Sequence, residues 1–376
     1  NAMVVANTVA AFQSISETKG YNVLPLNAFN VQKLLTAVNE CNEWGQIYII
    51  DALAHYTPSG AQEAESILER ISSRVSHSNA AVVISTVKII MKYLDFLTNA
   101  DLIRTYTKKT ASPLISLLSS DPEIQYVALR NINIVLQKRP NILDKETKMF
   151  FCNFNDPIYV KLEKLDALVK LADLKNIDAI LHEFKDYASE VDVEFVRKTI
   201  RSIGFCALKL EKASEKCVQV LWELLKGKIP YVVQESVIVI RDIFRKYPGK
   251  FEAVLRDICD QLKLLEEPEA KAAIIWIIGE YADTIENADD ILSEYAKGFK
   301  EEQAVVQIHL LTAYVKLYLN RPQCCEAEIQ SLLEMATKEC ENPDLRDRAF
   351  IYWRLLSKNP HLAKRIVLQE KPPISE

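Results

Sequence analysis

The amino-acid sequence predicts an all-α protein in which helical hairpins stack on one another to form a solenoid. Three observations support this fold class: glycine is scarce, apolar residues recur in a helical pattern at a long interval, and proline stands where helices should begin and end. The 376 residues include 8 Gly and 14 Pro, whereas average usage would give about 26 and 19. This scarcity disfavours folds that depend on glycine-rich turns, such as α/β nucleotide-binding folds and β-sandwiches.

Composition and charge exclude several further classes of protein. Because 49% of the residues are hydrophobic, the chain has enough apolar surface to fold and is not disordered. The 46 Lys and Arg against 51 Asp and Glu give a net charge of −5, which disfavours a nucleic-acid binder. Eight cysteines without a C-x₂-C pair are typical of reduced side chains on the helices of a cytosolic protein.

Ten segments of the chain carry the same apolar pattern, with members at positions i, i+4, i+5 and i+8. Position i+5 is apolar in all ten segments and position i+8 in nine, more often than a hydrophobic content of 49% predicts. These positions form one stripe along an α-helix. The anchors, position i of each segment, lie on average about 38 residues apart and are Val4, Ile47, Val82, Ile124, Val160, Phe195, Val232, Ala270, Val305 and Leu345.

Proline marks many of the predicted helix boundaries. A proline at the first helical position costs no hydrogen bond, and a preceding Asp or Asn can cap the helix. The predicted starts of this kind are Asp121-Pro122, Asp156-Pro157, Glu267-Pro268 and Asn342-Pro343. A proline just after a helix prevents its continuation. The predicted stops are Arg139-Pro140, Tyr247-Pro248, Arg321-Pro322 and Asn359-Pro360.

The repeating unit is therefore predicted to be a pair of antiparallel helices, similar in length to HEAT and armadillo repeats. The second helix of these pairs is predicted in segments such as 31–40, 62–75, 102–118, 216–225, 251–265 and 326–337. Because one pair is too thin to bury its own apolar stripe, the pairs must stack. We expect a right-handed α-solenoid of about ten layers.

The same reasoning predicts how the chain is organised. Residues 1–376 should form a single solenoid, and Asn1 and Ala2 before Met3 are interpreted as a cloning remnant. If the solenoid starts in mid-stack, its first apolar face lacks a covering repeat. We therefore expect the first helix, near Val4, Val9 and Phe12, to be frayed or covered by a second molecule.

The sequence predicts no catalytic, cofactor-binding or metal-binding residues. Asp51 and His55 are spaced i, i+4, but a hydrolase also needs a nucleophile and an oxyanion hole, and no motif of that kind is present. We interpret the two residues as a structural hydrogen bond and His309 as a hydrogen-bonded, semi-buried histidine. No other histidine or cysteine has partners at metal-ligand spacing. The expectation is a binding protein rather than an enzyme.

Seven strings of residues carry a resemblance to a known family, the beta-adaptins, which are large subunits of the heterotetrameric clathrin adaptor complexes. The resemblance is to the trunk domain of that family, and it runs from about Met3 to the closing string 371–376, essentially the whole chain. The strings are long and therefore specific: 123–140, 155–166, 190–198, 231–235, 240–248, 275–281 and 342–356.

The resemblance implies a fragment, the C-terminal portion of an adaptin trunk, without the hinge and appendage that follow in the family. It implies a scaffold subunit of a membrane coat that sorts cargo in vesicle-mediated transport, on the cytosolic face of trans-Golgi, endosomal or plasma membranes. The implied partners are the medium (mu), small (sigma) and second large adaptin subunits. Clathrin would bind only through the absent hinge and appendage, and membrane association would come from the whole complex.

Contacts with partners are expected at polar and aromatic side chains beside the buried stripe. The candidates are Arg241, Arg245, Tyr281, Arg346, Arg348 and Tyr352. Aromatic residues and arginine are enriched at protein interfaces. A second interpretation remains open at this point: another HEAT-repeat binding scaffold, such as a coatomer subunit or a nuclear-transport receptor.

Overall fold

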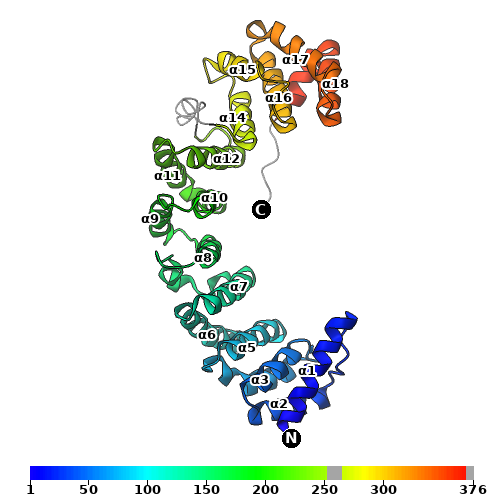
Figure 1. Ribbon diagram of the computed structural model, residues 1–376, viewed down its shortest axis with the longest axis vertical. Coiled ribbons are helices and arrows are strands. Elements are labelled where there is room, and N and C mark those ends of the chain that lie inside the picture. The colour runs from blue at the N-terminus through cyan, green and yellow to red at the C-terminus, as the bar shows by residue number, and fades with distance from the viewer. Residues whose placement is uncertain (252–264, 370–376) are drawn as a thin grey trace. The chain divides into compact units, whose positions relative to one another are not determined.

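The computed structural model describes residues 1–251 and 265–369, and its secondary structure is helical with no β-strand among them (Figure 1). The all-α prediction is confirmed for these residues. The predicted helix at 251–265, except for its two end residues, and the string 371–376 lie outside the described residues. The chain divides into two compact units, Asn1–Leu171 and Ala172–Glu376.

The first unit contains eight α-helices, joined by short turns and 3₁₀ segments. They are α1 (Ala2–Lys19), α2 (Ala28–Glu40), α3 (Glu43–Ala54), α4 (Ala61–Ile71), α5 (Ala80–Tyr93), α6 (Ala100–Ser116), α7 (Pro122–Lys138) and α8 (Ile158–Leu171). The helices that carry the predicted stripe pack on one another in sequence, α1 on α3, α3 on α5 and α7 on α8. The remaining helices form the second row of each hairpin.

The second unit repeats the arrangement. Its described α-helices are α9 (Ile177–Tyr187), α10 (Val193–Lys209), α11 (Ser214–Lys226), α12 (Pro230–Lys246), α14 (Pro268–Glu280), α15 (Ala288–Ala296), α16 (Ala304–Asn320), α17 (Glu326–Lys338), α18 (Pro343–Lys358) and α19 (Pro360–Val367). The stripe helices α10, α12, α14 and α16 again pack each on the next. Successive hairpins stack in this way within each unit (Figure 1).

The predicted stripe is the buried face of these helices, with differences in α1, α16 and α18. Position i+5 is buried in every stripe helix except α18, where Phe350 is 45% exposed. The anchors Val4 and Val305 are exposed. In α16 the buried row runs through Val306 and Leu310, so the true anchor lies one residue later than the predicted one.

The first helix differs from its prediction. Helix α1 is continuous from Ala2 to Lys19, and it packs on α3 with Ala6 and Val9 buried. Fraying is therefore not seen, because α3 supplies an apolar surface within the same unit, and cover of α1 by a second molecule stays a prediction. Val4 lies on the other side of α1 and is 61% exposed.

The proline boundaries are confirmed, with one difference at the start of α8. Helices α7, α12, α16 and α18 all end one residue before the Xaa-Pro pair. The residue before proline is driven out of the helical region; Arg139, for example, has φ −140° and ψ 75°. Helix α8 begins at Ile158, one residue after Pro157.

Of the predicted caps, Asn342 caps α18 by accepting a hydrogen bond from the Leu345 N–H. Asp121 makes no side-chain cap bond at α7. Asp156 instead binds the buried ammonium group of Lys164 at 2.6 Å. A buried lysine needs such a partner, which explains why this carboxylate is used for an ion pair.

Lysine and arginine side chains of one layer donate hydrogen bonds to backbone carbonyl groups at or just after the helix ends of the preceding layer. The last carbonyl groups of a helix have no partner within it and form the negative end of its dipole. Lys92, at the end of α5, donates to the carbonyl oxygen of Ala54, the last residue of α3, at 2.7 Å. Arg321, after α16, donates to the Asp283 carbonyl at 2.8 Å, beyond α14. The stack is therefore held by polar contacts at the helix ends as well as by its apolar stripe.

Two glycines allow stripe helices to approach closely. A Cβ atom at Gly204 of α10 would lie 2.5 Å from a methyl group of Val239 in α12, and one at Gly279 of α14 would lie 2.7 Å from the Ala313 backbone in α16. Real Cβ contacts are longer, so the helix axes could not stay at this separation with a larger residue. The small residue sets the spacing between layers.

We predict that Gly279→Ala destabilises the second unit. Alanine favours a helix by up to about 1 kcal/mol over glycine, but overpacking against a fixed backbone costs about 1–3 kcal/mol, so the net effect should be a loss of stability. The urea midpoint followed by circular dichroism measures it. Gly298→Ala is the control, because a Cβ there would meet no atom within 4 Å. Equal midpoints for the two variants would contradict the packing argument.

Candidate partner-binding site

Helix α18 borders two grooves in the second unit. The first, called the arginine groove, has a volume of about 910 Å³ and is lined by α14, α16, α18 and α19 together with Arg245 of α12. The second, called the acidic groove, has a volume of about 440 Å³ and is lined by α16, α17 and α18. Both are open surface features of a size that accepts side chains of a partner.

The arginine groove brings together three of the six predicted partner-binding residues, Arg245, Arg348 and Tyr352. Arg245 and Arg348 are exposed, and neither forms a hydrogen bond or ion pair with another residue of the described ranges 1–251 and 265–369. Their guanidinium groups are permanently charged and present planar donors. They are therefore available to a carboxylate or carbonyl group of a partner.

Polar side chains at the base of the arginine groove are held in place by α16. The Thr312 hydroxyl lies 3.2 Å from the Tyr352 hydroxyl, and Nδ1 of His309 lies 2.8 Å from the Val305 carbonyl oxygen. His309 is half-buried, as predicted from the sequence. Its pKa is lowered below 6.5, mainly by burial and further by the positive charges of Arg241 and Arg348. The imidazole is therefore neutral at neutral pH.

Apolar surface completes the arginine groove. Ile351 of α18 and Ile366 of α19 are 56% and 44% exposed, although both are large aliphatic residues. Trp276 of α14 also lines it. Tryptophan, tyrosine and arginine are the residues most enriched where interfaces gain their binding energy. Two exposed carboxylates, Asp344 and Asp347, share the lining, so the groove is mixed in charge rather than uniformly basic.

The other three predicted residues make contacts within the chain and do not line this groove. Arg241 donates to the neighbouring Asp242 carboxylate at 2.8 Å. Tyr281 packs edge-on against Phe244, with ring centroids 5.8 Å apart. Arg346 donates to the Glu341 carbonyl oxygen at 3.2 Å.

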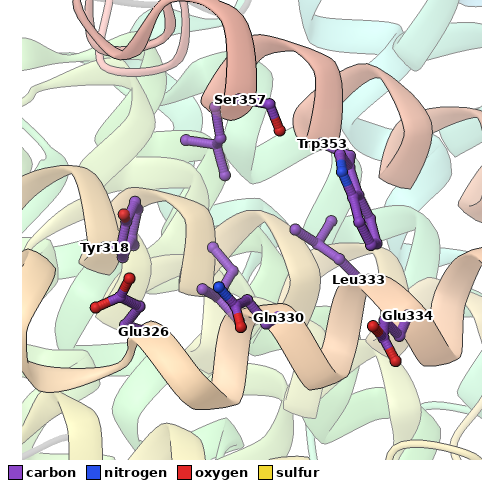
Figure 2. A pocket seen from close by; sticks show the side chains of 9 residues that line it. Tyr318, Glu326, Gln330, Leu333, Glu334, Trp353 and Ser357 are labelled. Carbon is purple, nitrogen blue, oxygen red and sulfur yellow. The ribbon is translucent and has the colours of Figure 1, made fainter.

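The acidic groove was not predicted from the sequence. Glu326, Gln330 and Glu334 follow one another at i, i+4 and i+8 along α17. Figure 2 shows Trp353 of α18 facing Leu333 of α17 across this groove. Trp353 stands at a stripe position, which predicted burial, but it is 38% exposed.

The predicted hydrogen bond between Asp51 and His55 is not formed. Helix α3 ends at Ala54, and His55 is its C-cap residue. The Asp51 carboxylate instead binds Nζ of Lys88 in α5 at 2.6 Å. The pair joins two layers of the first unit.

Metal-binding clusters and membrane-spanning helices are both absent from the part of the chain that the structure describes. No group of three or more His, Cys, Asp or Glu side chains is placed there to hold a metal ion. None of its helices combines the length and the apolar character needed to cross a membrane.

Comparison with known proteins gives a consistent family assignment. Residues 1–360 match the family profile described as the adaptin N terminal region. The chain is 54% identical over 376 residues to the AP-1 complex subunit beta of Dictyostelium discoideum, covering all of this chain and 40% of that protein. It is 44% identical over 376 residues to the AP-2 complex subunit beta of Schizosaccharomyces pombe, covering 56% of that protein. The chain thus spans about half the length, or less, of these relatives.

A structural comparison supports the fold. A homology model of the full-length AP-3 complex in an intermediate open conformation contains a chain that matches with a TM-score of 0.63 and 18% identity, over 86% of this chain and 62% of that one. An identity this low is evidence for the fold alone. Together with the helical hairpins described above, it confirms the predicted α-solenoid class.

We predict that stability falls as the pH is lowered below about 6.5 and that His309 contributes to the fall. A histidine whose pKa is lowered in the folded state is protonated at a lower pH in the folded protein than in the unfolded chain. Acid therefore favours unfolding, because the unfolded chain binds more protons. The contribution of the neutral His309 side chain to the free energy of unfolding is fully present above pH 6.5. It is lost as the pH falls through the pKa of His309 in the folded state.

Urea midpoints at pH 7.5 and pH 5 measure this effect for the wild type and for His309→Gln. The variant should lose less stability between the two pH values than the wild type does. His361→Gln, at an exposed position, is the matched control and should behave like the wild type. The interpretation fails if His309→Gln and the wild type lose the same amount.

Proposed function

Because the chain belongs to the adaptin N-terminal region family, we propose that it is a scaffold subunit of a heterotetrameric clathrin adaptor complex. In this role it holds the medium (mu), small (sigma) and second large subunits, so that the complex can sort cargo in vesicle-mediated transport. The identity of 54% to a protein named as an AP-1 beta subunit and the resemblance of seven long strings to beta-adaptins support the proposal.

We further propose that the chain is the later part of an adaptin trunk and forms one solenoid together with the segments around it. Clathrin would be bound through a hinge and appendage outside this chain, and membrane through the assembled complex. The site of action would be the cytosolic face of trans-Golgi, endosomal or plasma membranes. These proposals rest on the resemblance to beta-adaptins.

The observation that carries the binding role is the arginine groove. Its two arginines have no ion-pair partner in the described part of the chain, and exposed isoleucines lie beside them. An arrangement of charged donors around apolar surface suits a protein partner. We therefore propose binding rather than enzymatic activity, with Arg245, Arg348 and Tyr352 as partner contacts.

The remaining predicted contacts, Arg241, Tyr281 and Arg346, have a weaker claim because each already has a partner within the chain. The second interpretation from the sequence, a coatomer subunit or a nuclear-transport receptor, loses its support. The family match over residues 1–360 is to the adaptin N terminal region.

Co-expression with tagged medium, small and second large adaptin subunits tests the proposed function. We expect the wild-type chain to co-purify with these subunits. The double variant Arg245→Glu, Arg348→Glu should weaken the association by about tenfold or more, since truncating or reversing a central interface arginine costs at least about 1–2 kcal/mol.

Arg354→Glu is the matched control, an exposed arginine on the same α18 that does not line the arginine groove. It should leave the association unchanged. Circular dichroism should show the same helix content for all variants. Failure of the wild-type chain to associate would refute the scaffold role, and equal loss in Arg354→Glu would refute the groove as the contact.

A further inference from the structure

One ion pair in the second unit joins layers that are not neighbours. In a stack of repeats each layer contacts only the one before and the one after. Lys216 of α11 follows this rule by binding Asp178 of α9 at 2.6 Å. Arg197 of α10 instead binds Glu267, the residue just before α14, which lies 70 residues away in sequence. The contact bypasses α12.

The intervening helix is tied to the same face of α10. Nε of Arg201 donates to Oε1 of Glu235 in α12 at 2.5 Å, and Nη2 lies 3.3 Å from Oε2. Arg197 and Arg201 are one helical turn apart, so they point in similar directions from α10. Two successive arginines thus connect α10 to the next layer and to the one after it.

The local structure favours this long-range contact. Glu267 is at the N-cap position of α14, yet its side chain makes no cap hydrogen bond, and its carboxylate is used for Arg197. Pro268 restricts the backbone where the helix starts. Gly204 of α10 lets α12 approach closely at Val239, which shortens the span that the Arg197 side chain has to cross.

The pair is also able to break. The side chains of Arg197 and Glu267 are 31% and 36% exposed, so dissolved ions reach them and weaken their attraction. Nε of Arg197 is buried without a partner among the described residues, so this guanidinium is held by Glu267 through its other end. An ion pair of this kind can favour one arrangement of the helices and can still dissociate.

We propose that the Arg197–Glu267 pair is a conformational latch that sets the curvature of the α10, α12 and α14 layers. When the pair is closed, the first turns of α10 and α14 stay together on this face. When salt or a competing anionic group opens it, the two first turns separate and the layers straighten. This inference rests on contacts within the second unit and does not depend on the proposed function.

Distance measurements between spin labels test the latch. Labels attached to a noncanonical keto amino acid at positions 194 and 303 avoid the native cysteines. Both positions are exposed, and α16 follows α14 because the two helices pack closely at Gly279. In the wild type we expect a short, narrow distance distribution at about 0.05 M salt that lengthens and broadens at about 1 M salt, where screening acts over about 3 Å.

Arg197→Gln should show the longer, broader distribution already at low salt and should no longer respond to salt. The swapped variant Arg197→Glu, Glu267→Arg should restore the short distance, which distinguishes a latch from a general loss of folding. Lys216→Gln removes an ion pair between adjacent layers of the same unit and should leave the distance unchanged. An Arg197→Gln distribution identical to the wild type at low salt, or no recovery in the swapped variant, would overturn the proposal.

Discussion

The structure of both units depends on one constraint: a helical hairpin can bury its apolar stripe only against the next hairpin. The stripe residues of α10, α12, α14 and α16 are buried by this stacking, because each of these helices packs on the next. The separation of the layers is then fixed by their smallest residues. At Gly279 the backbone of α16 comes so close that a single additional carbon atom would collide with it.

Polar groups are arranged around this stack in a way that follows from the same geometry. Parallel stripe helices bring their carboxyl ends side by side, where unpaired carbonyl groups collect. Lysine and arginine side chains from the next layer donate to those groups, as Lys92 and Arg321 do. Buried charges such as Lys164 and Glu235 are each matched by an opposite charge. The layers are thus joined at their ends as well as along their apolar faces.

The candidate site arises where the stripe is not fully covered. Trp353 of α18 occupies a position that is buried in most other stripe helices, yet it is 38% exposed and lines the acidic groove. Helix α18 also borders the arginine groove, where arginine and isoleucine side chains are exposed. The same fold that buries apolar residues elsewhere exposes Ile351 and Ile366 here, beside Arg245 and Arg348, which have no ion-pair partner within the described chain.

The sequence by itself determined the helical class, the repeat and most helix boundaries. These features depend on local physics, such as the periodicity of apolar residues and the fixed φ angle of proline. Of the six partner contacts that the sequence predicted beside the buried stripe, three line the arginine groove, namely Arg245, Arg348 and Tyr352. Only the tertiary structure decided which residues meet across layers. The partner of Asp51 is Lys88, the partner of Arg197 is Glu267, and Trp353 faces Leu333. Such pairings depend on the rotation and spacing of one hairpin relative to the next, which are set by many small packing contacts at once and leave no short pattern in the chain.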